Sequence, residues 1–155
     1  MAFVKDELGV PPSPMRPGKI LLVEDDLGDV ELTVNALEND GIKNSIVTVR
    51  DGVDALEYLH ASNELPIFIL MDIKMPRKGG IETLREIRSD KRLRLIPVII
   101  FTSSRDRMDI INSYNYHANS YVVKPIDYRK FIENVADIGN FWAVFNVAPN
   151  KGGVL

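Results

Sequence analysis

Five short apolar runs, each followed by a segment with helical spacing, limit what this chain can fold into. The runs lie at 19–24, 46–50, 66–71, 97–101 and 120–123. Strands that alternate with helices are typical of βαβ units, in which helices cover both faces of a parallel sheet. Because βαβ crossovers are right-handed, the pattern predicts an α/β fold with a doubly wound five-stranded parallel sheet of order 2-1-3-4-5.

The helical segments cover 27–40, 51–60, 80–89, 105–115 and 127–145. In the first of them, Leu27, Val30 and Leu37 recur at helical spacing. Gly41 follows, at a position where a left-handed residue ends many helices. We expect one domain over residues 19–145, because 155 residues are too few for two domains of ordinary size.

Two tails flank this domain. Residues 1–18 contain four prolines, so they cannot sustain a helix or a central strand. We expect an extended arm there, which Phe3, Val4 and Leu8 could pack against the domain or a partner. A mostly disordered tail is the alternative. Residues 146–155 form the second tail.

Several classes of function are excluded or disfavoured by what the chain contains. It has no cysteine, which excludes disulfides, thiolate metal sites and cysteine nucleophiles. A formal net charge of −3 argues against nucleic acid as the main partner. Without an apolar signal segment or a run of transmembrane length, we expect a cytoplasmic location with no membrane contact. Neither G-x-G-x-x-G nor G-x-x-x-x-G-K-[ST] follows the first run, which disfavours dinucleotide and P-loop sites.

Polar residues stand at the carboxyl ends of four predicted strands. They are Glu24, Asp25 and Asp26 after the first strand, Asp72 after the third, Thr102 after the fourth and Lys124 after the fifth. In an open α/β sheet, ligands bind outside the carboxyl ends of the strands, where the strand order reverses. For order 2-1-3-4-5 that point lies between the first and third strands, so these side chains are expected to converge.

This convergence has a chemical interpretation. Several carboxylates in one crevice repel one another unless a cation compensates, and an all-oxygen ligand set suits Mg²⁺. Lys124 could pair with one oxygen of a bound anion and Thr102 could hydrogen-bond another. The set is what phosphoryl transfer to an aspartate requires, with Asp72, Lys124 and Thr102 as the catalytic residues and an aspartyl phosphate as the product.

Each of these residues also has a purely structural interpretation. The alternatives are a helix N-cap for Asp25 or Asp26, a turn before Met75-Pro76 for Asp72, a helix cap for Thr102 and a solvated position for Lys124. Such local roles do not explain why complementary groups follow so many strands on one side of the sheet. We therefore favour a shared site.

Four motifs carry a resemblance to a known family. They are LLVEDD (21–26), LMDIKMPRKGG (70–80), FTSS (101–104) and YVVKP (121–125). In order and spacing they resemble the two-component response-regulator receiver domain over residues 19–145, which has a flavodoxin-like fold. The resemblance implies a switch that catalyses only its own phosphorylation and dephosphorylation and is not an enzyme with a separate substrate.

Asp72 would be the phosphoacceptor in this family. The resemblance implies that Asp25 and Asp72 ligate Mg²⁺ directly and that the backbone carbonyl of Lys74 is a third ligand. Glu24 would act through a water molecule. Asp26 is left out of the metal set, because the family has no fixed carboxylate there.

The resemblance also assigns the residues around the phosphoryl group. Lys124 would contact it, and the peptide bond between Lys124 and Pro125 would be cis. Thr102 and Tyr121 match the switch pair, in which the threonine hydroxyl moves toward the phosphoryl group and the aromatic ring turns inward. One departure is Gly79, where the family often has an aspartate; it should alter the stiffness of the loop more than the chemistry.

Two stretches narrow the resemblance further. SYNYHANSYVVKPIDYRKF (113–131) and NFWAVFNVAP (140–149) resemble single-domain regulators paired with bacterial phytochrome histidine kinases. The partner would then be a light-sensing phytochrome kinase, and the alternative is a receiver paired with another histidine kinase. We expect output through protein contact.

The last helical segment is more apolar than one sheet face requires. One stripe carries Phe131, Val135, Ile138, Trp142 and Phe145, and Ile132, Phe141 and Val144 lie off it. A helix packed on one face needs a single buried stripe, so the excess predicts a symmetric homodimer through the last strand and helix. The alternative is a wide core-facing stripe that also packs a tail.

Two other functions remain as alternatives. A pseudo-receiver would be a pure interaction module, which the intact Asp25, Asp72, Thr102 and Lys124 argue against. A small-molecule binder such as a flavodoxin would share the strand order. The acid cluster suits a flavin phosphate poorly without a metal, however, and the first loop has no hydroxyl-rich phosphate cradle.

Overall fold

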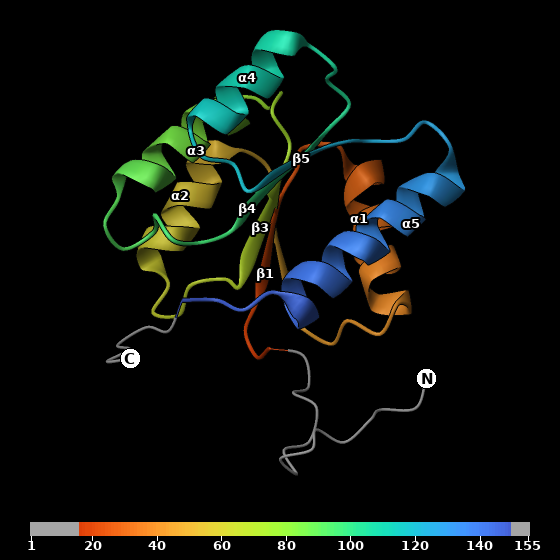
Figure 1. Cartoon of the computed structure of the whole chain (residues 1–155). Coiled ribbons are helices and arrows are strands. Elements are labelled where there is room, and N and C mark those ends of the chain that lie inside the picture. Colours follow the sequence, from red (N-terminus) through yellow and green to blue (C-terminus); the bar gives the residue numbers. More distant parts are fainter. Residues whose placement is uncertain (1–15, 150–155) are drawn as a thin grey trace.

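The structure is a computed structural model that describes residues 16–149, and its strands form one five-stranded sheet (Figure 1). The strands are β1 (Ile20–Val23), β2 (Ile46–Val49), β3 (Phe68–Met71), β4 (Val98–Thr102) and β5 (Ser120–Val123). Their order is β2-β1-β3-β4-β5, and every neighbouring pair is parallel. The predicted doubly wound, flavodoxin-like sheet is therefore confirmed.

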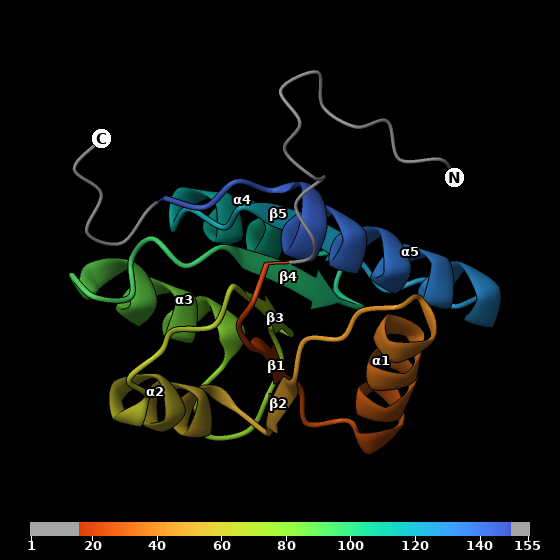
Figure 2. The same cartoon turned by 90° about the horizontal axis from the view of Figure 1, so that it is seen from below.

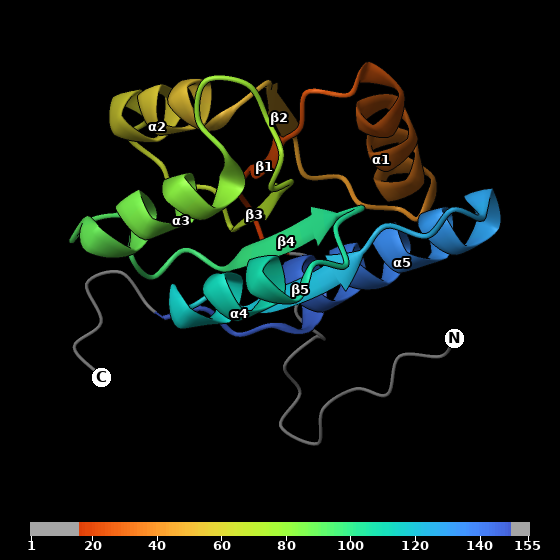
Figure 3. The same ribbon diagram turned by 90° about the horizontal axis from the view of Figure 1, so that it is seen from above.

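Five α-helices follow the strands, and a π-helical turn follows the last helix. They are α1 (Leu27–Asn39), α2 (Gly52–Ala61), α3 (Gly80–Ser89), α4 (Arg107–Asn115), α5 (Tyr128–Asn140) and η1 (Phe141–Phe145). α1 and α5 cover one face of the sheet, whereas α2 and α3 cover the other and α4 lies beside β5 (Figures 2 and 3). Both faces are thus covered, as expected for a parallel sheet.

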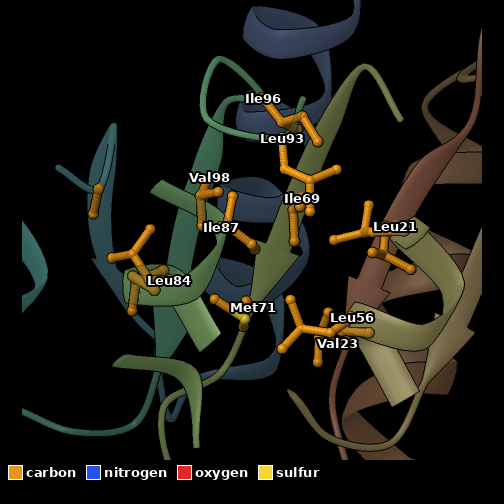
Figure 4. Packing of buried hydrophobic residues seen from close by; sticks show 14 of the residues in the cluster. Leu21, Val23, Leu56, Ile69, Met71, Leu84, Ile87, Leu93, Ile96 and Val98 are labelled. Atoms are coloured by element: carbon orange, nitrogen blue, oxygen red, sulfur yellow. The ribbon is translucent and has the colours of Figure 1, made fainter. Parts of the chain in front are cut away.

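The core consists of two apolar clusters, one on each face of the sheet. In β1, Leu21 and Val23 belong to the cluster under α2 and α3, whereas Ile20 and Leu22 belong to the cluster under α1 and α5. Figure 4 shows the first cluster, in which Leu84 of α3 packs with side chains of the central strands. Because β1, β3 and β4 are buried on both faces, their sequences are apolar throughout except for Thr102 at the end of β4.

Aspartates begin most of the helices. The N-cap side chains that accept a first-turn backbone N–H are Asp26, Asp51, Asp106 and Asp127. Asp26 therefore has the capping role that its structural interpretation proposed, and Thr102 does not cap α4, because Asp106 does. α3 begins after Gly79, which has no side chain to cap it.

The last helix differs from the predicted single stripe. α5 ends at Asn140, and the following turn has π-helical spacing, with the N–H of Asn146 donating to the carbonyl of Phe141 at 2.7 Å. The wider turn changes which side chains face the core. Ala143 is fully buried, whereas Phe145 is 69% exposed. The predicted stripe is correct for Phe131, Val135 and Ile138 and wrong for Phe145.

The described ends of the chain lie together at the amino ends of the strands. The N–H of Arg16 donates to the carbonyl of Ala143 at 3.0 Å, and its guanidinium donates to the carbonyl of Trp142 at 3.3 Å. Arg16 and Pro149 line the same cavity, of about 650 Å³. Most of the predicted arm, residues 1–15, and the end of the second tail, residues 150–155, lie outside the described part.

Within residues 16–149, every helix is too short or too polar to cross a membrane.

Candidate functional site

Four side chains from adjacent strand ends converge at the carboxyl edge of the sheet. Glu24 follows β1, Asp72 follows β3, Lys124 follows β5 and Thr102 is the last residue of β4. The strand order places β1 beside β3, so the first two residues are neighbours across the point where the order reverses. The four side chains therefore come together at this edge, as the sequence predicted.

Lys124 is the centre of the charge network. Its ammonium group is almost buried and pairs with three carboxylates: Glu24 in a short contact, Asp29 at 2.7 Å and Asp72 at 3.0 Å. Burial alone would lower the pKa of Lys124, but the hydrogen bonds to Asp29 and Glu24 and the charge of Asp72 outweigh it and raise that pKa. The lysine therefore stays charged in the pocket.

Three acids form a cluster beside this lysine. Glu24, Asp25 and Asp72 each offer a carboxylate oxygen, and these oxygens lie within 4.8 Å of one another. Burial and the neighbouring Asp72 raise the pKa of Glu24 to about 9. Burial would also raise the pKa of Asp72, but contacts with Glu24, Thr102 and Lys124 outweigh it and lower that pKa. The pKa values of two close carboxyl groups separate in this way, because the negative charge on one makes ionisation of the other less favourable.

The donor set fits a divalent cation. Within the described residues, the Oε2 atom of Glu24 is buried and has no hydrogen-bond partner. Such an atom is costly unless a water or an ion satisfies it. An oxygen-only cluster with one free oxygen is the chemistry that Mg²⁺ or Mn²⁺ accepts, commonly through a retained water.

Lys74 lies two residues beyond Asp72, in the loop between β3 and α3, and its side chain is exposed. Only its carbonyl was expected to take part in the site. The loop starts with a tight local contact, since the N–H of Ile73 donates to Oδ1 of Asp72 at 2.7 Å. The Lys74 side chain is not part of the acidic cluster.

Thr102 and Tyr121 are linked through a common neighbour. The N–H of Ser104 donates to Oγ1 of Thr102 at 3.2 Å, and the hydroxyl of Tyr121 donates to the carbonyl of Ser104 at 2.8 Å. Thr102 is buried and Tyr121 is half-buried against the core cluster of α2 and α3. The loop after β4 therefore connects the two side chains.

The peptide bond between Lys124 and Pro125 is trans, since the described residues contain no cis peptide. The expected cis bond is therefore wrong for this structure. The intrinsic preference of an X–Pro bond is small, about 0.5–1 kcal/mol, so the surrounding backbone decides the isomer. Here the N–H of Lys124 still donates to the carbonyl of Thr102 at 2.7 Å, which holds the lysine at its strand end.

Asp29 is a site residue that the sequence did not reveal. It lies in the first turn of α1, three residues after the N-cap Asp26, whose side chain accepts its N–H at 2.9 Å. The turn brings its carboxylate back over the strand ends to Lys124. The sequence does place an acid three residues after a capping aspartate. The rule that ligands bind at the carboxyl ends of strands does not consider residues on helices, so it misses Asp29.

Of the residues predicted for dimerisation, Ile132 lies in the first half of α5, and Phe141 and Val144 lie in η1. Ile132 and Val144 are half-buried against the core cluster of α1 and α5. Phe141 is 49% exposed and meets Trp142 edge-on, with 4.9 Å between ring centroids. They are not part of the acidic pocket, and a dimer through them stays a prediction.

Comparison with known proteins relates the whole sheet and its pocket to one family. The family model of the response regulator receiver domain matches residues 20–136. A probable methanogenesis regulatory protein, FilR2 of Methanothrix harundinacea, is 36% identical over 137 residues, which cover 86% of this chain and 88% of FilR2. Response regulator Rcp1 of Synechocystis is 35% identical over 131 residues, which cover 81% of this chain and 89% of Rcp1.

Two solved structures extend the comparison to three dimensions. The phosphorylated cyanobacterial phytochrome response regulator RcpA has a TM-score of 0.82 and 37% identity, and the match covers 87% of this chain and all of RcpA. The Mn²⁺-bound form of Rcp1 has a TM-score of 0.81 and 33% identity, covering 86% of this chain and all of that structure. Both share the fold over nearly the whole described chain.

Proposed function

The chain belongs to the response regulator receiver domain family, a module of two-component signalling, and we propose that it works by accepting a phosphoryl group on Asp72 from a histidine kinase. The observation that carries the proposal is that Asp72 belongs to the acidic cluster and also pairs with Lys124. It offers a nucleophile, a place for a cation and a positive charge for the incoming anion.

The chemistry at Asp72 is a displacement at phosphorus. A carboxylate oxygen of Asp72 forms a P–O bond while the P–N bond of a phosphohistidine breaks, and the electron pair stays on the imidazole nitrogen. Lys124, freed in part from Asp72, pairs with a phosphoryl oxygen. A cavity of about 340 Å³ adjoins Lys124, between the starts of α1 and α5.

Mg²⁺ is the cofactor that this proposal includes, and when bound it would neutralise charge on the phosphoryl oxygens. Asp25 and Asp72 would hold it directly, Glu24 would hold it through a water and the Lys74 carbonyl would be a third ligand. The acidic cluster and the Mn²⁺-bound form of the relative Rcp1 support this assignment. The uncompensated oxygen of Glu24 supports it further.

The response to phosphorylation would run through Thr102 and Tyr121. As the hydroxyl of Thr102 turns to the phosphoryl group, it loses the N–H of Ser104, and the same residue's carbonyl holds the hydroxyl of Tyr121. Because both side chains contact Ser104, movement of Thr102 could break the hydrogen bond that holds the hydroxyl of Tyr121. Their role as a switch pair rests on this contact and on the family resemblance.

The proposed partners are a kinase and a second copy of the chain. The likeness to a cyanobacterial phytochrome response regulator favours a phytochrome kinase, and another histidine kinase is the alternative. A homodimer would use Ile132 of α5 and Phe141 and Val144 of η1. We further propose the domain limits 19–145 and a cytoplasmic location, where such a kinase would present its phosphohistidine.

The test is incubation with acetyl phosphate and Mg²⁺, followed by intact mass measurement. One phosphate adduct is expected on the wild type and none on Asp72→Asn. Asp26→Asn is the matched control, because asparagine also caps a helix and this acid lies outside the cluster, so it should be phosphorylated like the wild type. A wild type that takes up no phosphate would leave the pseudo-receiver alternative standing.

A further inference from the structure

The loop between β3 and α3 contains a residue in an unusual backbone conformation. Arg77 has a φ of 58°, in the left-handed region that residues with a side chain rarely adopt. Such a conformation persists only where the surroundings hold it. The loop begins at the proposed phosphoacceptor, Asp72, and ends at Gly79 before α3. The contacts of Arg77 therefore bear on the geometry of the site.

The guanidinium of Arg77 joins the loop to the start of α2. Its Nε donates to Oδ2 of Asp51 at 2.7 Å, and its Nη2 donates to Oδ1 of Asp51 at 3.1 Å and to Oδ1 of Asp54 at 2.6 Å. A two-point contact between planar groups defines orientation as well as distance. Arg77 is half-exposed, whereas Asp51 is buried, so the anchor is on the α2 side.

Asp51 is suited to be the fixed end of this contact. Its side chain also caps α2 by accepting the N–H of Asp54 at 3.0 Å. Burial alone would raise the pKa of Asp51, but the hydrogen bonds from Arg77 and the backbone outweigh it and lower that pKa. The carboxylate is therefore charged and held from two directions.

A backbone contact brings the same two segments together. The N–H of Gly52 donates to the carbonyl of Lys78 at 3.0 Å, and a Cβ on Gly52 would lie 1.8 Å from Oγ1 of Thr83 and 2.9 Å from the Lys78 carbonyl. Only glycine permits this approach. Figure 3 shows the loop after β3 arching beside the start of α2.

We propose that Arg77, held by Asp51 and Asp54, is a positioning residue that fixes the Lys74 carbonyl for the divalent cation. The inference rests on the proposed function, because it takes that carbonyl as a metal ligand. Lys74 lies in the short span between two fixed points. At one end the carbonyl of Ile73 accepts the N–H of Gly80 at 2.8 Å, and at the other is Arg77.

Gly79 leaves the α3 end of this loop without a side-chain cap. The family often has an aspartate there, but glycine starts α3 here without a side-chain cap. The contact of Arg77 with Asp51 and Asp54 supplies a restraint on the same loop from the other side. An ordered outer contact commonly determines how well a ligand atom meets its metal.

A purely electrostatic effect and the positioning role predict opposite changes in Mg²⁺ affinity when Arg77 is removed. A guanidinium near an acidic pocket repels a divalent cation, so its loss by a purely Coulombic effect would tighten cation binding. Positioning predicts weaker binding. Lys78 offers a matched control, because it carries the same charge in the same loop and its ammonium pairs with Glu86 instead of α2.

The experiment measures Mg²⁺ binding to the full chain by isothermal titration calorimetry. Arg77→Ala should weaken binding about tenfold, the size typical of losing an outer contact of a metal site. Arg77→Lys, which keeps the charge and loses the two-point contact, should lie between, and so should Asp54→Asn. Lys78→Gln should bind as the wild type does, or slightly more tightly.

A second readout is the Mg²⁺ dependence of phosphorylation by acetyl phosphate. For Arg77→Ala, the half-saturating Mg²⁺ concentration should rise as the affinity falls, with the maximal rate little changed, because excess cation compensates for a poorly placed ligand. Unchanged Mg²⁺ affinity in a folded Arg77→Ala would overturn the inference, even if its melting temperature falls. If Arg77→Ala does not fold, wild-type affinity in Asp54→Asn and Arg77→Lys overturns it.

These measurements separate the inference from the proposed function. A wild type that binds Mg²⁺ with the predicted dependence on Arg77 but takes up no phosphate supports the positioning role and rejects the phosphoacceptor. A wild type that is phosphorylated with the same Mg²⁺ affinity in every variant does the reverse. A wild type that binds no Mg²⁺ overturns the inference.

Discussion

The acidic pocket and the end of α5 are the two most distinctive regions of the molecule, and different forces order them. In the pocket, the almost buried Lys124 meets three carboxylates from two strand ends and α1. At the end of α5, Phe141 and Phe145 leave large aromatic surfaces exposed. The first region combines charges far apart in sequence, whereas the second depends on how a few consecutive residues turn.

This difference determines how each region responds to change. A buried ion network loses most when one member is removed, because the others stay buried without compensation. An exposed apolar segment changes the stability of the monomer little and matters only when something covers it. Variants in the pocket should therefore alter phosphorylation and stability, whereas variants of exposed residues at the end of α5 should mainly alter association.

The largest effect is expected from Lys124→Met. Asp29, Asp72 and Glu24 lose their common ion-pair and hydrogen-bond partner, so the free energy of unfolding should fall by about 3–5 kcal/mol in the absence of Mg²⁺, and added Mg²⁺ should restore part of it. Phosphorylation by acetyl phosphate should slow about a hundredfold or more. Urea unfolding and intact mass measure the two effects. Lys130→Met, at an exposed position on α5, should change neither, and a Lys124→Met protein with wild-type rate would contradict the network's role.

The next effect tests the position at which α5 turns away from the core. Phe131→Ala should cost about 3 kcal/mol, because its ring is buried against Phe101 at 5.1 Å between centroids. Phe145→Ala, on the far side of the π turn, should cost less than about 0.5 kcal/mol. Urea unfolding of both variants compares them. Equal losses would mean that one continuous stripe, as the sequence predicted, faces the core in solution.

A smaller effect concerns association. If α5 forms the proposed dimer, Phe141→Glu should raise the dissociation constant about tenfold or more, since a charge would replace an interface aromatic. Analytical ultracentrifugation with and without acetyl phosphate measures it. Tyr114→Glu on α4 is a control of similar exposure and should leave association unchanged. A wild type that is monomeric at micromolar concentration in both conditions would remove the dimer.

The smallest effect is a pH dependence at Asp51. The pKa of Asp51 is lowered in the folded protein, so its stabilisation is complete above its unfolded value of about 3.9 and is lost as the pH falls through the folded pKa. The stability difference between wild type and Asp51→Asn should be constant near neutral pH and should shrink by about 1 kcal/mol below about pH 4. Urea unfolding at pH 7, 4 and 3 measures this stability difference. A difference that grows at low pH would contradict the prediction.

Much of the fold and part of the pocket could be predicted from the sequence. The apolar runs and the handedness of βαβ units lead to the strand order, and the strand ends then place Glu24, Asp72 and Lys124 together. These inferences succeed because they use long-range regularities that hold for every parallel sheet. The roles of the residues in catalysis remain proposals.

Other features could not be predicted in this way. Asp29 enters the pocket from a helical turn, and Arg77 reaches Asp51 from a loop whose left-handed residue carries no glycine signal. The π turn after Asn140 shifts the buried face by local hydrogen bonding that apolar spacing does not reveal. Each depends on backbone geometry within a few residues, for which the sequence pattern is ambiguous.

The contact between Arg16 and Ala143 has a practical consequence for protein engineering. Because Arg16, at the start of the described chain, is hydrogen-bonded to Ala143 and lines one cavity with Pro149 at its end, a short linker could connect the two ends. New ends could then be opened at the exposed Asn63, between α2 and β3, in a circular permutant that keeps every strand pair. A reporter domain inserted there would sit away from the carboxyl edge of the sheet and leave it free for the kinase.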